Sequence, residues 1–398
     1  MIRVPYGMTV HGEEEIKAVE HVLRTSTQMG RHVRDFEKKV SSLFHKKYGV
    51  MVNSGSSALL LSLEILELPE KSQVITPILT FSTTVAAILK NNLIPAFVDV
   101  EPNTFCIDVE KIEEMITSQT KAMCVPNLLG NIARWPEIRK IADQYDLKLV
   151  EDSADTLGGL IAGKPSGFFS DISITSFYGS HIINCAGNGG LLALNNKEMY
   201  RKSLLLRSWG RSSSLFIDSE NIEQRFNAKL NDMDYDSKFI FEMVGYNFEP
   251  SEMGAAFGLV QLKNLNNNID ERIKNFKFLY NFFSTYTDYF DLPSQTPHTK
   301  TGWLAFPIVI KETAPFSRKD LQIFLENRNI QTRVIFTGNI NVQPGFSNIP
   351  KKLNNSGYPF ADNVMRGGML LACHHGLNQE MKAHMIDSLT AFLKRFES

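Results

Sequence analysis

The stretch Leu147-Lys148-Leu149-Val150-Glu151-Asp152-Ser153-Ala154-Asp155 decides the predicted fold. Its first four residues have the length and apolar character of a short buried strand, and three carboxylates follow within the next five residues. In open α/β sheets, ligands bind beyond the carboxyl ends of the parallel strands. The stretch therefore predicts one strand of a parallel sheet, with candidate binding groups at the end of that strand.

Other short apolar runs lie on both sides of this stretch, from about Tyr48 to about Leu206. The runs with strand-like composition are residues 48–53, 73–78, 94–100, 122–125, 171–178 and 190–194. The stretches between them, among them 56–66 and 135–145, place apolar residues at helical spacing. Short strands that alternate with helices favour an α/β fold, in which a mostly parallel central sheet is flanked by helices.

The pattern changes beyond this region. Residues 208–244 are polar and aromatic without regular hydrophobic spacing, which predicts a long functional loop. A long helical pattern follows over residues 251–286. Three further runs predict a smaller α+β domain: strand-like 303–310, helical 318–327 and strand-like 330–336. We therefore expect a large domain over residues 1–250, which contains the insertion, and a linking helix with a small C-terminal domain over residues 251–398.

The composition excludes several classes of partner. The chain has 398 residues and a formal net charge of -1 at pH 7, so no overall positive field attracts nucleic acid or an anionic membrane. Its four cysteines are scattered, with no spacing typical of a disulfide framework or a zinc site. The first residues lack the basic and apolar run of a signal peptide, and no apolar stretch is long enough to span a bilayer. We therefore expect a cytoplasmic protein without a bound metal.

Two short segments carry candidate binding groups. Residues 53–58, Asn-Ser-Gly-Ser-Ser-Ala, lie between a predicted strand and a predicted helix. Gly55, Ser56 and Ser57 would present polar groups at a helix N-terminus, which suits a phosphate, although the same residues are ordinary helix caps. Asp152, at the end of its strand, would form an ion pair with the protonated nitrogen of a pyridine ring. An ordinary acidic loop is the alternative interpretation of this second segment.

The third segment, residues 176–190, reads Ser-Phe-Tyr-Gly-Ser-His-Ile-Ile-Asn-Cys-Ala-Gly-Asn-Gly-Gly. A predicted strand ends here in a glycine-rich loop with one central ionisable side chain, His181. Small residues on both sides of the histidine let a ligand approach the backbone closely. A lone histidine is more often structural than catalytic, so only its surroundings make His181 a catalytic candidate.

In chain order, these three segments resemble the DegT/DnrJ/EryC1/StrS sugar aminotransferases, which are fold-type-I enzymes that use pyridoxal 5'-phosphate (PLP). Three further segments are similar to the same family: Gly30-Arg31-His32-Val33-Arg34-Asp35-Phe36-Glu37, Thr80-Phe81-Ser82-Thr83 and Gly245-Tyr246-Asn247-Phe248. The resemblance extends over nearly the whole chain. It implies an aspartate-aminotransferase-like fold and a homodimer with shared active sites.

The resemblance also implies roles for individual residues. The implied cofactor-binding residues are Gly55, Ser56, Ser57 and Ser176 for the phosphate, Phe81 for stacking on the ring, Asp152 for the ring nitrogen, Asp155 for the surroundings of the phenolic oxygen, and Asn247 for the phosphate in the neighbouring subunit. These roles are expectations that depend on the family resemblance.

One position departs from the family pattern. The family aminotransferases carry a lysine where this chain has His181, and no lysine lies between Lys164 and Lys197. That lysine binds PLP covalently and moves protons between cofactor and substrate. Histidine has no primary amine, but its ordinary pKa of about 6.5 suits a general base near neutral pH. We therefore expect non-covalent binding of PLP, or of its amino form pyridoxamine 5'-phosphate (PMP), with His181 as the catalytic base.

The same replacement of lysine by histidine is found in a subset of the family, which this chain resembles: the PMP-dependent 3-dehydratases that make 3,6-dideoxyhexoses. Residues 209–211 (Trp-Gly-Arg) and 332–339 (Thr-Arg-Val-Ile-Phe-Thr-Gly-Asn) resemble the same subset. One branch binds a [2Fe–2S] cluster through cysteines in the insertion, but residues 208–244 contain no cysteine. The nearer resemblance is to the cluster-free, colitose-type branch. It implies no iron–sulfur cluster, a nucleotide-sugar substrate (a 4-keto-6-deoxyhexose) and L-glutamate as the amino donor.

Two residues keep two interpretations each. Arg333 would hold an anionic group of glutamate or of the nucleotide, and a surface ion pair explains it nearly as well. Tyr178 would contact the sugar or pack in the core, with packing slightly favoured.

A nucleotide-sugar aminotransferase and a catalytically inactive protein that binds sugar nucleotides are the alternatives to a dehydratase. The sequence does not distinguish GDP, CDP and dTDP as the nucleotide.

Overall fold

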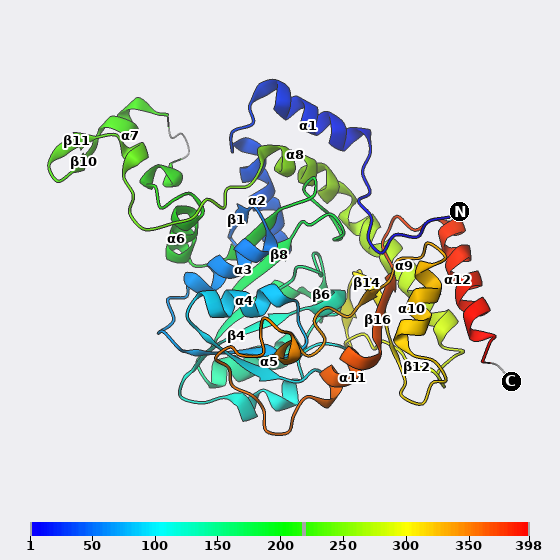
Figure 1. Cartoon of the computed structure of the whole chain (residues 1–398). Helices are drawn as coiled ribbons and strands as arrows, with labels where there is room; N and C mark the ends of the chain where they lie inside the picture. Colours follow the sequence, from blue (N-terminus) through cyan, green and yellow to red (C-terminus); the bar gives the residue numbers. More distant parts are fainter. Residues whose placement is uncertain (1, 217–219, 397–398) are drawn as a thin grey trace.

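The computed structural model describes residues 2–216 and 220–396, and its centre is a seven-stranded sheet (Figure 1). The strand order is β1-β9-β8-β5-β4-β2-β3. β9 runs antiparallel to both of its neighbours, and all other neighbouring strands are parallel. The strands are Tyr48–Val52 (β1), Gln73–Pro77 (β2), Ile94–Val98 (β3), Thr120–Pro126 (β4), Lys148–Asp152 (β5), Ile172–Ser176 (β8) and Gly190–Leu194 (β9). The predicted mostly parallel sheet is therefore confirmed.

Helices cover both faces of this sheet. β2 and β9 are buried along their whole length, as expected for strands between two layers of helices. Val74 and Ile75, which are adjacent on β2, belong to different core clusters, so these clusters lie on opposite faces. The helices that contribute to them are α3 (Gly55–Glu64) and α4 (Ser82–Lys90) on one face and α5 (Trp135–Gln144) on the other.

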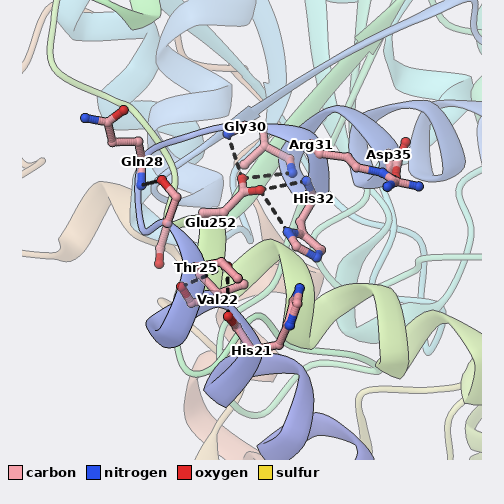
Figure 2. Close-up of polar contacts among 12 residues, drawn as sticks. His21, Val22, Thr25, Gln28, Gly30, Arg31, His32, Asp35 and Glu252 are labelled. Atoms are coloured by element: carbon pink, nitrogen blue, oxygen red, sulfur yellow. Dashed lines mark hydrogen bonds and ion pairs between the residues drawn. The ribbon is translucent and has the colours of Figure 1, made fainter.

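The buried carboxylate of Glu252 holds the start of the second N-terminal helix (Figure 2). The N-terminal helices are α1 (Glu13–Thr25) and α2 (Arg31–Leu43), and both pack on α8 (Glu252–Gln261). The buried Glu252 carboxylate accepts hydrogen bonds from the backbone N–H groups of Gly30 (2.8 Å), His32 (2.7 Å) and Val33 (3.2 Å). It also lies 2.9 Å from Nδ1 of His32. Glu252 thus satisfies donors at the start of α2 that no carbonyl within the helix can reach.

The C-terminal part contains a second sheet, which is antiparallel and has the order β12-β14-β16-β15. Its strands are Phe290–Asp291 (β12), Ala305–Ile310 (β14), Arg333–Val334 (β15) and Gly368–Ala372 (β16), with helices α10 (Arg318–Glu326), α11 (Pro359–Gly367) and α12 (Gln379–Leu393) beside them. The expected strand at 330–336 is wrong in extent. Within this range only the two residues of β15 pair with β16. Ile330 pairs with Val4 instead, and Phe336 leaves the extended conformation with a φ of 42°. A domain boundary at residue 250 stays a prediction.

The helical pattern at 251–286 forms two helices, not one. α8 is followed by a 3₁₀ turn at Leu262–Asn264 and then by α9 (Leu265–Phe283). Helix α9 contacts both parts of the molecule. Asn268 donates a hydrogen bond to the carbonyl of Ile182, which follows β8, and Asn275 donates one to the carbonyl of His374, which follows β16.

Residues 208–244, predicted as a loop, contain short regular elements, and we call this segment the arm. It follows α6 (Lys197–Arg207) and contains α7 (Ile222–Phe226) and a hairpin of β10 (Ala228–Leu230) and β11 (Met233–Tyr235). Strands of three residues are too short to produce a recognisable alternation, which explains the error. Residues 217–219 lie outside the described residues. The hairpin and α7 project from the body of the molecule (Figure 1).

Several chemical features of the described residues bear on function. None of the helices in this part of the chain has the length and apolar content that a bilayer span requires. The same residues contain no group of three or more His, Cys, Asp or Glu side chains that would hold a metal ion. Cys106, Cys124, Cys185 and Cys373 are all buried and have free thiols.

Candidate active site

A cavity of about 380 Å³ lies beyond the carboxyl ends of β4, β5 and β8. Leu304 and Phe336 from the C-terminal part and Tyr6 from the N-terminal segment complete its wall. The position is the one where α/β sheets bind ligands. Eight of the predicted site residues line the cavity: Gly55, Ser56, Phe81, Asp152, Asp155, Ser176, Tyr178 and His181.

The N-terminus of α3 forms one end of the cavity. Ser54 caps this helix by accepting a hydrogen bond from the N–H of Ser57 at 3.1 Å. A Cβ atom at Gly55 would lie 2.7 Å from the Cβ of Ser176, so only glycine lets this serine approach the helix end. Backbone donors at a helix N-terminus, with serine hydroxyls beside them, suit a phosphate. Ser57 differs from the expectation, because its hydroxyl donates to Oδ1 of Asn53 at 2.7 Å and does not line the cavity.

Asp152 lies at the end of β5 and is buried. Its carboxylate accepts hydrogen bonds from the N–H of Ala154 and from the hydroxyl of Thr84, both at 3.1 Å. Burial raises the pKa of Asp152 to about 6, against which these two hydrogen bonds act. A buried carboxylate is stabilised by a cationic partner, and the protonated nitrogen of a pyridine ring is such a partner. Thr84 was not predicted from the sequence, because a threonine within a helix gives no signal of a distant partner.

Asp155 lines the same cavity and is also buried. Burial, followed by the charge of Asp152, raises the pKa of Asp155 to about 7, while a hydrogen bond from Leu129 and the charge of Arg272 lower it. The N–H of Leu129 donates to Oδ2 of Asp155 at 2.9 Å. Leu129 adopts a left-handed backbone conformation, with φ 61° and ψ 10°, which costs a non-glycine residue about 1–2 kcal/mol. The hydrogen bond to Asp155 offsets part of this strain.

His181 is oriented by the backbone of the segment after β5. Its Nδ1 lies 2.5 Å from the carbonyl oxygen of Ala154. Because a carbonyl only accepts, the contact with Ala154 favours the neutral imidazole that carries its proton on Nδ1, which leaves Nε2 as the unprotonated nitrogen. Burial lowers the pKa of His181 to about 4, and the charge of Arg272 also lowers it, while the backbone carbonyls of Ala154 and Ser176 raise it. The side chain is therefore neutral at neutral pH and able to accept a proton.

Two aromatic residues lie at the mouth of the cavity. Phe81 precedes α4 and is 52% exposed, and its ring meets the edge of Phe336 at a centroid distance of 5.8 Å. An exposed ring at this place can cover one face of a planar ligand. Of the two interpretations of Tyr178, packing in the core, which was slightly favoured, is wrong: the side chain is 59% exposed, and its ring lies 6.2 Å from that of His181. Its contact with the sugar stays a prediction.

Arg333 and Asn247 do not line the cavity. The guanidinium of Arg333 lies 5.5 Å from the ring of Tyr6, which does line it, and donates to the carbonyl of Thr332 at 2.7 Å. Asn247 pairs through its backbone with Ser208 at the base of the arm. No sequence pattern selects Tyr6, because contacts with residues far along the chain, among them the pairing of Val4 with Ile330, bring the N-terminal segment to the site.

These residues fit a phosphorylated pyridine ring. A helix N-terminus with serine hydroxyls matches the phosphate, the buried Asp152 matches a protonated ring nitrogen, and the exposed Phe81 matches the face of the ring. The fold and the site thus have the features of the PLP-dependent aminotransferases. The chain belongs to the DegT/DnrJ/EryC1/StrS aminotransferase family, whose sequence model matches residues 9–390. The family resemblance seen in the sequence is therefore confirmed.

The named relatives of this chain include dehydratases. The lipopolysaccharide biosynthesis protein RfbH of Salmonella typhimurium is 33% identical over 98% of this chain and 91% of its own length. The dTDP-4-dehydro-2,6-dideoxy-D-glucose 3-dehydratase of Saccharopolyspora spinosa is 32% identical over 98% of this chain and 86% of its own length. The solved structure of the E. coli GDP-4-keto-6-deoxy-D-mannose-3-dehydratase with bound hydrated PLP is 30% identical, with a TM-score of 0.88 over 98% of this chain and 100% of that chain.

Proposed function

We propose that this protein is a PLP- and PMP-dependent 3-dehydratase, which removes the C3 hydroxyl of a nucleotide-linked 4-keto-6-deoxyhexose. The observation that carries the proposal is that His181 lines a cavity whose other residues suit the cofactor, at the position where the sequence resemblance expects the lysine of the family. A histidine retains proton transfer and removes the covalent bond to PLP. The proposed enzyme is therefore a hydro-lyase and not a transferase. Dehydratases among its relatives support this assignment.

The proposed cofactor is held without a covalent bond. Ser56, Ser176 and the N-terminus of α3 would bind its phosphate, Asp152 its ring nitrogen, and Phe81 one face of its ring. When bound, the cofactor supplies an amino group that condenses with the C4 ketone of the sugar, and a protonated ring that withdraws electrons. The ion pair with Asp152 keeps this ring protonated, because the charged forms of both partners stabilise each other.

His181 performs the proposed proton transfers. The hydrogen bond from Nδ1 to Ala154 fixes the ring, so that Nε2 would accept the proton from the cofactor carbon next to the amino group. The protonated imidazole would then give this proton to the C3 hydroxyl, which would leave as water. In the other half of the cycle, L-glutamate is the proposed amino donor, and His181 moves the proton that accompanies its conversion to 2-oxoglutarate.

The proposed assembly is a homodimer with shared active sites. Asn247 does not line the cavity of its own chain, as expected for a residue that serves the neighbouring subunit. The arm carries exposed apolar side chains, among them Ile222 (73%) and Met233 (59%), which a second chain would cover in the proposed dimer. Tyr178 and Arg333 are the proposed substrate contacts. A cytoplasmic role in lipopolysaccharide or O-antigen synthesis is also proposed, in view of the named role of the Salmonella relative.

A panel of substrates tests the function. The purified protein, with PLP and glutamate, would be incubated with 4-keto-6-deoxyhexoses linked to GDP, CDP or dTDP, and the products identified by mass spectrometry. A 3-deoxy-4-keto sugar from one of them is the expected result. A 4-amino sugar would identify an aminotransferase instead. Absence of any product, together with no shift of the PLP absorbance on addition of glutamate, would indicate a binding protein. No iron or sulfide should be found in the active preparation, since the arm lacks cysteine.

A further inference from the structure

Arg272 on α9 is fully buried, yet it does not line the cavity. Its guanidinium donates to four backbone carbonyls. Nη1 reaches those of Trp303 at 3.1 Å and Leu304 at 2.9 Å, and Nη2 reaches those of Ser180 and His181, both at 3.2 Å. Its Nε has no partner among the described residues, and burial lowers the pKa of Arg272 to about 10. Burying a guanidinium costs several kcal/mol, so this arrangement calls for an explanation.

Helix α9 holds the loop that carries His181 by more than one side chain. Asn268, one turn before Arg272, donates to the carbonyl of Ile182 at 3.0 Å. Residues four apart lie on the same face of a helix. One face of α9 therefore binds three consecutive carbonyls, those of residues 180, 181 and 182, and fixes the backbone at the catalytic candidate.

The same guanidinium connects this loop to the part of the cavity wall that contains Leu304. Leu304, whose carbonyl it binds, lines the cavity, and its N–H donates to the carbonyl of Leu129 at 2.8 Å. The N–H of Leu129 in turn donates to Asp155. A continuous series of hydrogen bonds therefore runs from the backbone of His181 through Arg272 to the Asp155 carboxylate.

We propose that Arg272 is a positioning residue for His181. It fixes the loop against the segment that enters β14, so that the imidazole keeps its hydrogen bond to Ala154 and presents Nε2 to the cavity. The inference rests on the proposed function only for the reaction in which His181 acts. The contacts themselves do not depend on the identity of the sugar.

Charge adds to this geometric effect. The titratable groups that line the cavity with His181 are Asp152 and Asp155 after β5, Tyr178 from the same loop and Tyr6 from the N-terminal segment, and the charged group that acts on the imidazole is Arg272 from α9. The guanidinium charge opposes protonation of His181, in addition to burial. Removal of this charge should therefore raise the pKa of His181, as well as loosen its backbone.

The test compares Arg272→Met and Arg272→Lys with Asn275→Ala. Asn275 is a matched control, because it is buried one turn further along α9 and donates to the carbonyl of His374 instead of the His181 loop. The first measurement is the single-turnover rate with glutamate as a function of pH. A misplaced catalytic group costs about 10²-fold in rate, which is the loss expected for Arg272→Met. Arg272→Lys should recover part of it, and Asn275→Ala should lose stability without a change in the rate or its pH profile.

The second measurement does not require activity. The His181 ring would be titrated by NMR in cofactor-free protein labelled at histidine carbon, with His181→Asn used to assign its signal. Arg272→Met is expected to move the His181 pKa upward. If Arg272→Met does not fold, Arg272→Lys decides the question through the same NMR titration and rate profile. A folded Arg272 variant with an unchanged titration and an unchanged rate would overturn the proposal. If the wild-type protein catalysed no dehydration, this result alone would count against the proposed function. The glutamate rate and the NMR titration would still test the role of Arg272.

Discussion

At the scale of single residues, His181 contacts the carbonyl of Ala154, the residue before Asp155, and burial moves the pKa values of His181 and Asp155 in opposite directions. The pKa of His181 falls to about 4, and that of Asp155 rises to about 7. At neutral pH the imidazole is therefore an unprotonated base, while the carboxyl group is close to its titration midpoint. Titratable groups whose pKa values are pushed apart in one cavity indicate acid–base chemistry.

Replacement of His181 by asparagine should abolish both half-reactions and leave PLP affinity near that of the wild type. Asparagine keeps a polar side chain of similar reach but cannot accept a proton at this pH, and loss of a general base costs about 10²- to 10⁴-fold in rate. The rates with glutamate and with the sugar would be measured in single turnovers, and PLP binding by its absorbance. Dehydration at the wild-type rate would place the base elsewhere.

Replacement of His181 by lysine should restore a covalent bond to PLP. The wild type has no amine at this position, so borohydride should leave PLP removable by dialysis, whereas His181→Lys should give a stoichiometric phosphopyridoxyl peptide. Dehydration should fall by at least about 10²-fold, because the positioned base is lost. Mass spectrometry of the digests would measure the amount of phosphopyridoxyl peptide in the wild type and in the variant. Stoichiometric fixation of PLP on wild-type protein would contradict the central assignment.

Replacement of Asp155 by asparagine should stabilise the cofactor-free protein at high pH. Folding raises the pKa of Asp155 from 3.8 to about 7, so its stabilising contribution is present below pH 3.8 and is lost as the pH rises through 7. The asparagine amide would keep an acceptor for the N–H of Leu129 and carry no charge. We expect a gain of about 1–3 kcal/mol at pH 8 that vanishes near pH 4. Urea unfolding at several pH values measures it, and a loss of stability at pH 8 would mean that attraction to Arg272 outweighs burial.

At the scale of elements, the position of α2 depends on one carboxylate from α8 (Figure 2). Glu252→Gln keeps the shape of the side chain but replaces charge-assisted hydrogen bonds with neutral ones. The free energy of unfolding should fall by about 1–3 kcal/mol, measured in urea. Glu14→Gln is the control, because Glu14 also lies in the first turn of a helix but is 73% exposed in its pair with Lys263. That change should stay within about 0.5 kcal/mol, and equal effects of the two would refute the capping role.

The elements also show what the sequence can and cannot predict. Strands such as β5 were predictable because each is a short apolar run whose end carries polar residues. The cavity residues of those strand ends, Asp152 and Ser176, were found for the same reason. Tyr6, Thr84 and Arg272 were missed because each acts on residues far away in the chain, through contacts that leave no local pattern. The arm was missed as structure because its strands are only three residues long.

At the scale of the whole molecule, the proposed dimer makes a specific prediction. Asn247→Ala should leave the protein dimeric in sedimentation but weaken PLP binding about tenfold, because the neighbouring cavity loses one hydrogen bond to a charged phosphate. Asn264→Ala is the control, because Asn264 is exposed and its side chain does not cap α9. That variant should bind PLP as the wild type does. A fully active monomer in sedimentation velocity would exclude shared active sites.

The burial of all four cysteines has a practical consequence. Thiol reagents should find nothing to modify on the folded protein, so their uptake reports unfolding directly. A cysteine introduced at Lys229, an exposed polar position on β10, would then be the single reactive thiol, with no need to remove the native ones. A spin label or fluorophore attached there would report on the arm alone, because the four native cysteines in the interior would remain unlabelled.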